Sequence, residues 1–316
     1  MVQKFAHWLG GIALHWFYRD VRVTDSDRIP LHGPTLIAMN HQNALVDAIL
    51  ALWIIPREVR LTAKATLGDS VPGALLLKLV GIIPLRRASD DPAASDPIRN
   101  RHSFKAIIEE MRRGGAVLVF PEGKSHNDPE IAPLKTGLAR AALRAREAGV
   151  RNIQIVPIGI TFEDKAQPDT AVHAQVGRPI ALDDWDGNDP RALTETIAAG
   201  LRAISLTGEI SSRDGGTPLD HRNAPIQLAA WWGRTMHMIP LRLARWQAIR
   251  LSEDEGEPAM YTMTLGLGAI IVSYLIEVPI VWLLFGWIVG LLFFASLVIG
   301  AYWAAYADHS PERSRA

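Results

Sequence analysis

The chain has 316 residues, of which 48% are hydrophobic and 21% are charged, and its formal net charge is zero. This neutral balance gives no support to a nucleic-acid-binding surface. The lack of cysteine excludes a disulfide framework, a thiolate nucleophile and a cysteine-ligated metal. Because the composition is close to the globular average, any membrane signal has to be local.

The N-terminal stretch, residues 1–20, combines Trp, Leu and Phe with a few basic side chains. It lacks the long apolar core and the small-residue cleavage site that characterise a secretory signal. We therefore expect it to form a short amphipathic anchor.

Residues 21–210 alternate short apolar runs with longer helical patterns. The runs LIAMN, GIIPL, AVLVF and IQIVPIGITF are typical of buried strands, and stretches such as Ser103–Arg113 and Lys135–Ala148 are typical of helices. This alternation predicts an α/β domain whose central sheet is mainly parallel and flanked by helices.

A linker and a Trp-rich segment follow at residues 211–257. The sequence SSRDGGTP at 211–218 indicates a linker or loop. From Pro225 to Leu251, arginines are interleaved with Trp and Leu. This pattern fits an amphipathic helix at a bilayer interface, and an ordinary packed helix broken at Pro240 is the alternative.

Residues 258–307 carry the strongest apolar signal. From Thr262 to Ala307 the only charged residue is Glu277, and this length is enough for two membrane-spanning helices of roughly 20 residues each. The turn between them falls near Glu277–Pro279 or near Gly286. A buried hairpin in a soluble core is the alternative.

The flanks of this hairpin suggest its orientation. Arginines precede it, and the polar tail at residues 308–316 contains Arg313 and Arg315. Because basic residues favour the cytoplasmic side, we expect a cytoplasmic (inner) membrane protein whose α/β domain at residues 21–210 faces the cytoplasm.

A first motif, NHQNALVD, directly follows the apolar run at 35–39 and contains His41 and Asp47. An imidazole can take the proton of an attacking hydroxyl, and a carboxylate can hold its tautomer. Residues six apart point in different directions on a helix, so the pair meets only if His41 lies in the loop before the helix that carries Asp47. A helix start with an unrelated His and carboxylate is the alternative.

A second motif, GIIPLRR, ends in Arg86 and Arg87. Two guanidinium groups after an apolar strand offer bidentate donors to a phosphate. Lys64 is a single cation that can join the same patch. Solvated surface side chains are the alternative for all three.

A third motif, FPEGKS, ends the apolar strand AVLVF. Gly123 permits close backbone approach, Lys124 and Ser125 supply donors, and Glu122 can fix an arginine or accept a substrate hydroxyl. His126 follows, without any metal-ligand spacing, so no metal site is expected.

A fourth motif, VPIGI, contains Pro157 inside an apolar strand. Pro157 would interrupt ladder pairing and turn an apolar face toward a hydrophobic ligand. An edge strand of the core is the alternative.

In this order the four motifs resemble the PlsC-like glycerolipid acyltransferases, the superfamily of lysophosphatidic acid and glycerol-3-phosphate acyltransferases. The resemblance extends from about Val23 to Pro179. It implies that His41 is the general base and Asp47 its partner. This chain places five residues between the two, whereas the commoner family pattern has four.

The resemblance also implies roles for the other motifs. Arg87, with Glu122 and Gly123, would bind the phosphate of the acceptor, and Pro157 would line a substrate channel. The implied reaction moves an acyl group from acyl-CoA or acyl carrier protein to a hydroxyl of a glycerol-phosphate lipid, such as lysophosphatidic acid, without a cofactor.

Two other classes of function remain open at this point: a lipid hydrolase and a catalytically silent lipid-binding scaffold. The acceptor is also open among lysophosphatidate, glycerol-3-phosphate, another lysophospholipid and an ornithine-type lipid. The expected partners are membrane lipid and the acyl donor, with no nucleic acid. The residues do not indicate an oligomeric state.

Overall fold

The computed structural model describes residues 2–69, 81–85, 101–126, 128, 130–205, 224–252 and 257–306. The expectations for Arg86, Arg87, the linker at 211–218 and the tail at 308–316 concern residues outside these ranges.

The described elements alternate between strands and helices along the first two thirds of the chain. The strands are β1 (Asp20–Thr24), β2 (Thr35–Met39), β3 (Val59–Lys64), β4 (Ile83–Leu85), β5 (Ala116–Val119), β6 (Gln154–Phe162), β7 (Ala171–Val176) and β8 (Ile180–Ala181). The α-helices are α1 (Val2–Phe17), α2 (Ala44–Ile54), α4 (Arg101–Arg112), α5 (Gly137–Glu147), α6 (Pro190–Ile204), α7 (Ala224–Leu251), α8 (Glu257–Phe285) and α9 (Trp287–Tyr306). Short 3-10 turns lie at Ser26–Arg28, Ala65–Asp69 and Leu182–Asp184.

The strands form one sheet in the order β1-β7-β6-β2-β5-β3-β4, and β8 pairs with β6. The strands β6, β2, β5, β3 and β4 run parallel to one another. Strand β7 is antiparallel to β6 and parallel to β1. The prediction of an α/β domain with a mainly parallel sheet is confirmed. Strand β6 lies between β2 and β7, so the alternative that it is an edge strand is wrong.

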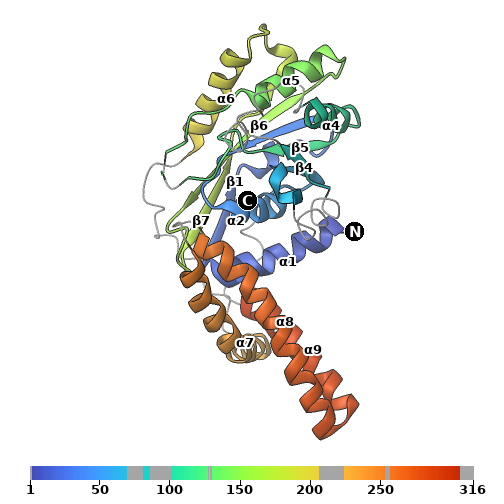
Figure 1. The fold of residues 1–316 in the computed structure, drawn as a ribbon, viewed down its shortest axis with the longest axis vertical. Coiled ribbons are helices and arrows are strands. Elements are labelled where there is room, and N and C mark those ends of the chain that lie inside the picture. The colour runs from blue at the N-terminus through green and yellow to red at the C-terminus, as the bar shows by residue number, and fades with distance from the viewer. Residues whose placement is uncertain are drawn as a thin grey trace.

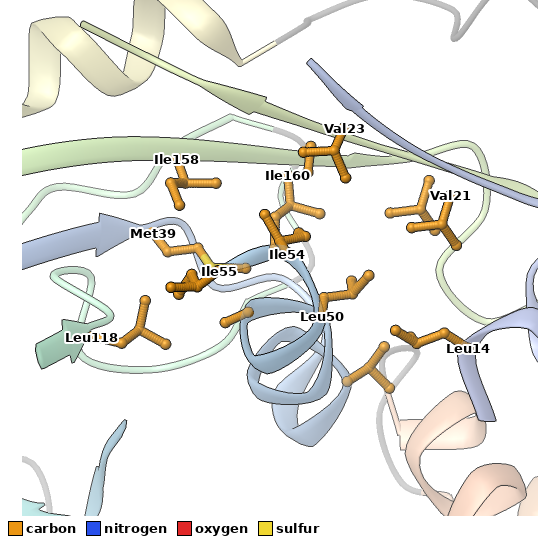
Figure 2. Close-up of a cluster of buried hydrophobic side chains, with 14 of the residues drawn as sticks. Leu14, Val21, Val23, Met39, Leu50, Ile54, Ile55, Leu118, Ile158 and Ile160 are labelled. Atoms are coloured by element: carbon orange, nitrogen blue, oxygen red, sulfur yellow. The ribbon is translucent and has the colours of Figure 1, made fainter. Parts of the chain in front are cut away.

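Helices cover both faces of the sheet, as Figure 1 shows. On one face α1 and α2 enclose a core that includes Leu14, Leu50, Met39 and Ile158, drawn in Figure 2. On the other face α4, α5 and α6 enclose a second core. Because Leu14 is fully buried, the last turns of α1 belong to the α/β core. Each buried aliphatic side chain contributes about 1.5–3 kcal/mol of transfer free energy.

Helix α7 packs against α8 and α9 through a stripe of small residues. Its buried positions include Ala230, Gly233, Ala244 and Ala248, while its outer face exposes large apolar side chains. The helix is continuous through Pro240, so the break that the packed-helix alternative places there is wrong, although α7 does pack against its neighbours.

Helices α8 and α9 form a hairpin that extends away from the sheet (Figure 1). The turn is at Gly286, which has a positive φ of 87°, and α8 continues past Glu277 and Pro279. This decides between the two turn positions that the sequence allows. Within the described ranges, α8 and α9 are the helices long and apolar enough to cross a membrane. The hydrophobic windows of α8 and α9 are 0% and 22% buried, which argues against a hairpin inside a soluble core.

Candidate active site

The first and third sequence motifs meet at the carboxyl edge of the parallel strands. His41 follows the end of β2, and Glu122 follows the end of β5. Lys64 is the last residue of β3. In open α/β sheets ligands bind outside the carboxyl ends of the strands. The fold therefore gathers chemical groups where such a site is expected.

His41 and Asp47 are joined by a hydrogen bond. The Nδ1 atom of His41 lies 2.8 Å from Oδ2 of Asp47. A carboxylate only accepts, so Nδ1 donates, and Nε2 is the ring nitrogen left to take a proton. His41 lies in the loop before α2, and Asp47 lies in the first turn of that helix. The sequence requires His41 to lie in the loop before the helix that carries Asp47, and the structure places it there.

The start of α2 fixes the carboxylate of Asp47. Its side chain is 0% exposed, and Oδ2 also accepts from the backbone N–H groups of Gln42 and Asn43, each at 2.8 Å. Ala44 has a positive φ of 42°, which lets the loop turn sharply into the helix. Three donors at the start of α2 therefore fix the position of the Asp47 carboxylate.

The side chains of Phe120 and Asn40 fix the imidazole of His41 and the end of β2. The ring of Phe120 stacks on His41, with centroids 4.1 Å apart and planes 16° apart. The amide of Asn40 donates to the carbonyl of Ile160 at 2.8 Å and accepts from its N–H at 2.6 Å. This reciprocal pair ties the end of β2 to β6 directly before His41.

The carboxylate of Glu122 also bonds to this loop. Its Oε1 accepts from the backbone N–H of His41 at 2.6 Å. Its Oε2 accepts from the N–H of Ala132 at 2.8 Å and from the ring of His126. The Glu122 side chain is 0% exposed. His41, Asp47 and Glu122 therefore form one connected network.

Lys165 and Tyr18 form further hydrogen bonds with the loop that follows His41. Lys165 donates from Nζ to the carbonyl oxygens of Gln42 and His126, at 3.2 and 3.3 Å. The amide of Asn43 donates to the hydroxyl of Tyr18 at 2.9 Å. Burial, and then the negative charge of Asp47, raise the pKa of Tyr18 well above its usual value. Tyr18 therefore stays neutral and serves as a fixed hydroxyl.

The remaining candidates lie at varying distances from this centre. Lys124 and Ser125 are exposed in the turn after Glu122, and Gly123 in that turn has a positive φ of 83°. Lys64 is exposed two strand positions from β2, which corresponds to about 10 Å between the strand axes.

Pro157 does not join the His41 network. It is buried in β6 and faces α6, because a side chain added at Gly177 or Gly200 would contact its ring at 2.7 or 3.4 Å. Arg86 and Arg87 lie outside the described residues. In the part of the chain that the structure describes, no group of three or more His, Asp or Glu side chains is arranged to hold a metal ion.

Sequence reasoning missed four residues of this site: Tyr18, Phe120, His126 and Lys165. His126 lies four residues after Glu122, but the sequence offers it only as a metal ligand that lacks metal-ligand spacing. Lys165 belongs to no motif. Its role depends on where the turn after β6 folds, and no local pattern encodes that.

Comparison with known proteins gives the family. The family profile described as "Acyltransferase" matches residues 20–161. Glycerol-3-phosphate O-acyltransferase 2 of Saccharomyces cerevisiae is 29% identical, over 35% of this chain and 15% of its own length. Human 1-acyl-sn-glycerol-3-phosphate acyltransferase alpha is 24% identical, over 62% of this chain and 67% of its own length.

Among solved structures, the crystal structure of the 1-acyl-sn-glycerophosphate (LPA) acyltransferase PlsC from Thermotoga maritima has 19% sequence identity and a TM-score of 0.49. The match covers 64% of this chain and 77% of that one. This chain spans less than half the length of several curated relatives, for example 45% of a chloroplastic relative from Brassica napus. Residues 20–161 of this chain belong to the acyltransferase family, and this region is PlsC-like.

Proposed function

We propose that the chain transfers a fatty acyl group from acyl-CoA or acyl carrier protein to a hydroxyl of a glycerol-phosphate lipid. The single observation that supports this most is the hydrogen bond between Nδ1 of His41 and Oδ2 of Asp47. This bond leaves Nε2 to act as a general base at the carboxyl edge of the sheet. The PlsC-like family membership supports the same chemistry.

The proposed reaction is a direct transfer. Nε2 of His41 takes the proton of the acceptor hydroxyl, and the oxygen attacks the thioester carbonyl. The C–S bond breaks, and the departing thiolate takes the proton from the imidazolium. Asp47 stabilises the imidazolium between these steps. No covalent enzyme intermediate is needed.

The proposed acceptor is lysophosphatidic acid, which would give phosphatidic acid in phospholipid biosynthesis. Relatives named for lysophosphatidate-type and glycerol-3-phosphate substrates both match this chain, so glycerol-3-phosphate and other lysophospholipids are tested in parallel. Arg86 and Arg87, with Lys64, Lys124 and the FPEGKS turn, would supply the cationic groups for the phosphate.

Membrane attachment is part of the proposal. The exposed apolar surfaces of α8 and α9 support a membrane-bound protein with lipid as its partner. The arginines before and after the hairpin support the cytoplasmic membrane, with the α/β domain facing the cytoplasm. Burial of an acyl chain yields about 0.8 kcal/mol per CH₂, so a site beside the bilayer suits lipid substrates.

Product analysis tests the function. Purified protein is given labelled acyl-CoA with lysophosphatidate, with glycerol-3-phosphate, or with a lysolipid that lacks phosphate. We expect labelled phosphatidate from lysophosphatidate and a preference for acceptors that carry phosphate. Free fatty acid as the only product would favour a hydrolase instead.

Two variants accompany this assay. His41→Ala should abolish transfer, whereas His32→Ala should not, because His32 is exposed and precedes β2. Unchanged lipid output from His41→Ala would favour a silent scaffold. Equal turnover of acceptors without phosphate would contradict the phosphate preference.

A further inference from the structure

Glu122 has little capacity left to bind a substrate. Its side chain is 0% exposed. Oε1 accepts from the backbone of His41, and Oε2 accepts from the backbone of Ala132 and the ring of His126. A carboxylate would also repel a phosphate. These contacts favour a different role for Glu122 from the phosphate contact that the family resemblance implies.

His126 is the side chain that bonds to this carboxylate. Its Nε2 donates to Oε2 of Glu122, and its side chain is 8% exposed. Lys165 donates from Nζ to the carbonyl oxygen of His126 at 3.3 Å, which holds the backbone there. A buried carboxylate that loses such a partner is left with an unmatched charge, and its position changes.

The turn that contains Glu122 and His126 bonds to both the N–H and the carbonyl oxygen of His41. The N–H of His41 donates to Oε1 of Glu122 at 2.6 Å, and its carbonyl oxygen accepts from the N–H of His126 at 3.2 Å. Phe120, at the start of this turn, stacks on the imidazole. The segment 120–126 thus contacts the ring, the N–H and the carbonyl oxygen of His41.

We infer that His126 is a positioning residue: its imidazole holds the Glu122 carboxylate in the geometry that fixes the backbone of His41. Neither side chain touches the acceptor's phosphate. This inference rests on the proposed acyl transfer, because it concerns the base of that reaction. A displacement of about 1 Å in a reacting group can lower kcat about 10²-fold.

Paired variants separate positioning from substrate binding. His126→Gln places an amide donor close to where Nε2 lies, whereas His126→Leu has a similar size and no donor. We expect His126→Leu to lower kcat about 10²-fold, with the KM for the acceptor within about threefold of wild type. His126→Gln should stay within about fivefold of wild-type kcat. His102→Leu on α4, which changes an exposed histidine, is the matched control.

Glu122→Gln provides a second test that keeps the side-chain volume. An amide has one oxygen, so it cannot accept both from the His41 backbone and from Ala132 and His126. We expect kcat to fall and the KM for the acceptor to change little. If either Glu122→Gln or His126→Leu raises the KM for the acceptor and leaves kcat unchanged, the two residues bind substrate and the inference is wrong.

Hydrogen exchange distinguishes failure of this inference from failure of the proposed function, because it needs no activity. Exchange is followed by mass spectrometry in the peptide that contains Asn40–Asn43, with α6 as the internal control. We expect exchange at least about tenfold faster in His126→Leu, and wild-type exchange in His126→Gln. Unchanged exchange in His126→Leu would overturn the positioning role, whether or not the wild type transfers acyl groups. Should His126→Leu fail to fold, Glu122→Gln must show the same faster exchange.

Discussion

The Nδ1 atom of His41 and the Oδ2 atom of Asp47 lie 2.8 Å apart, across the boundary between a loop and the first turn of α2. The same oxygen accepts from the two backbone N–H groups that follow His41. The loop and the helix start therefore converge on one atom. The orientation of the imidazole depends on the charge and acceptor capacity of that atom.

Asp47→Asn is expected to lower kcat by about 10²- to 10⁴-fold, because a neutral amide can accept the same hydrogen bonds but cannot stabilise an imidazolium as a carboxylate does. The measurement is steady-state acyl transfer, with circular dichroism to check folding. Glu195→Gln on α6, an exposed carboxylate, serves as the control. Activity of Asp47→Asn within threefold of wild type would contradict the role of this pair.

Gly233→Ala is expected to weaken the packing of α7 on α9. A Cβ at position 233 would lie 2.0 Å from the carbonyl oxygen of Gly300. Alanine normally stabilises a helix relative to glycine by about 1 kcal/mol, but overpacking costs about 1–3 kcal/mol, so a net loss is predicted. Thermal unfolding in detergent measures it.

Gly268→Ala on α8 is the matched control, because a Cβ there meets nothing within 4 Å. It should unfold at the wild-type temperature or slightly higher. The close approach of α7 to α9 would be contradicted if both alanine variants behaved alike.

Leu283→Asp is expected to reduce membrane binding. Leu283 is 85% exposed, near the end of α8. An Asp costs about 2.5–3.5 kcal/mol at the centre of a membrane-spanning helix, and a smaller cost is expected near its end. Flotation with phospholipid vesicles measures the bound fraction. Leu31→Asp is the control, since Leu31 is 57% exposed in the α/β domain. Equal flotation of the two variants would argue against insertion of the hairpin.

The stability of the α/β domain is expected to fall as the pH drops below about 6.5, partly through His173. Burial, and then Arg22, lower the pKa of His173, which lies on β7. The unfolded chain therefore binds a proton in this range that the folded chain does not, so the free energy of unfolding decreases with falling pH.

Urea unfolding at pH 7.5 and pH 5.5 measures this effect, and the comparison is with His173→Gln. Glutamine keeps a polar group near Thr24, whose hydroxyl contacts the imidazole at 3.2 Å. The variant should lose less stability than wild type between the two pH values. A larger loss in the variant would contradict the assignment.

The sequence predicts the frame of the site well, because the relevant signals are local. Buried apolar runs identify the parallel strands, and the motifs that follow them have to meet at one edge of the sheet. The spacing of His41 and Asp47 also implies that they meet only if His41 lies in the loop before α2, and the structure shows this arrangement.

The parts that the sequence does not predict depend on tertiary contacts. The position of Lys165 is set by how the turn after β6 folds over the loop of His41. Glu122 is a polar residue in a glycine-containing turn, so its complete burial cannot be read from its neighbours in the chain. The hairpin turn at Gly286, rather than at Glu277–Pro279, depends on the backbone conformation at one residue.

The central claim is that His41 is the base of an acyl transfer. The direct test is the initial rate of thiol release from acyl-CoA, with and without lysophosphatidate, for wild type and His41→Gln. The chain has no cysteine, so a thiol reagent reports only on the released coenzyme. We predict acceptor-dependent release by wild type and a loss of about 10²- to 10⁴-fold in His41→Gln. Acceptor-dependent release that continues at the wild-type rate in His41→Gln would contradict the account.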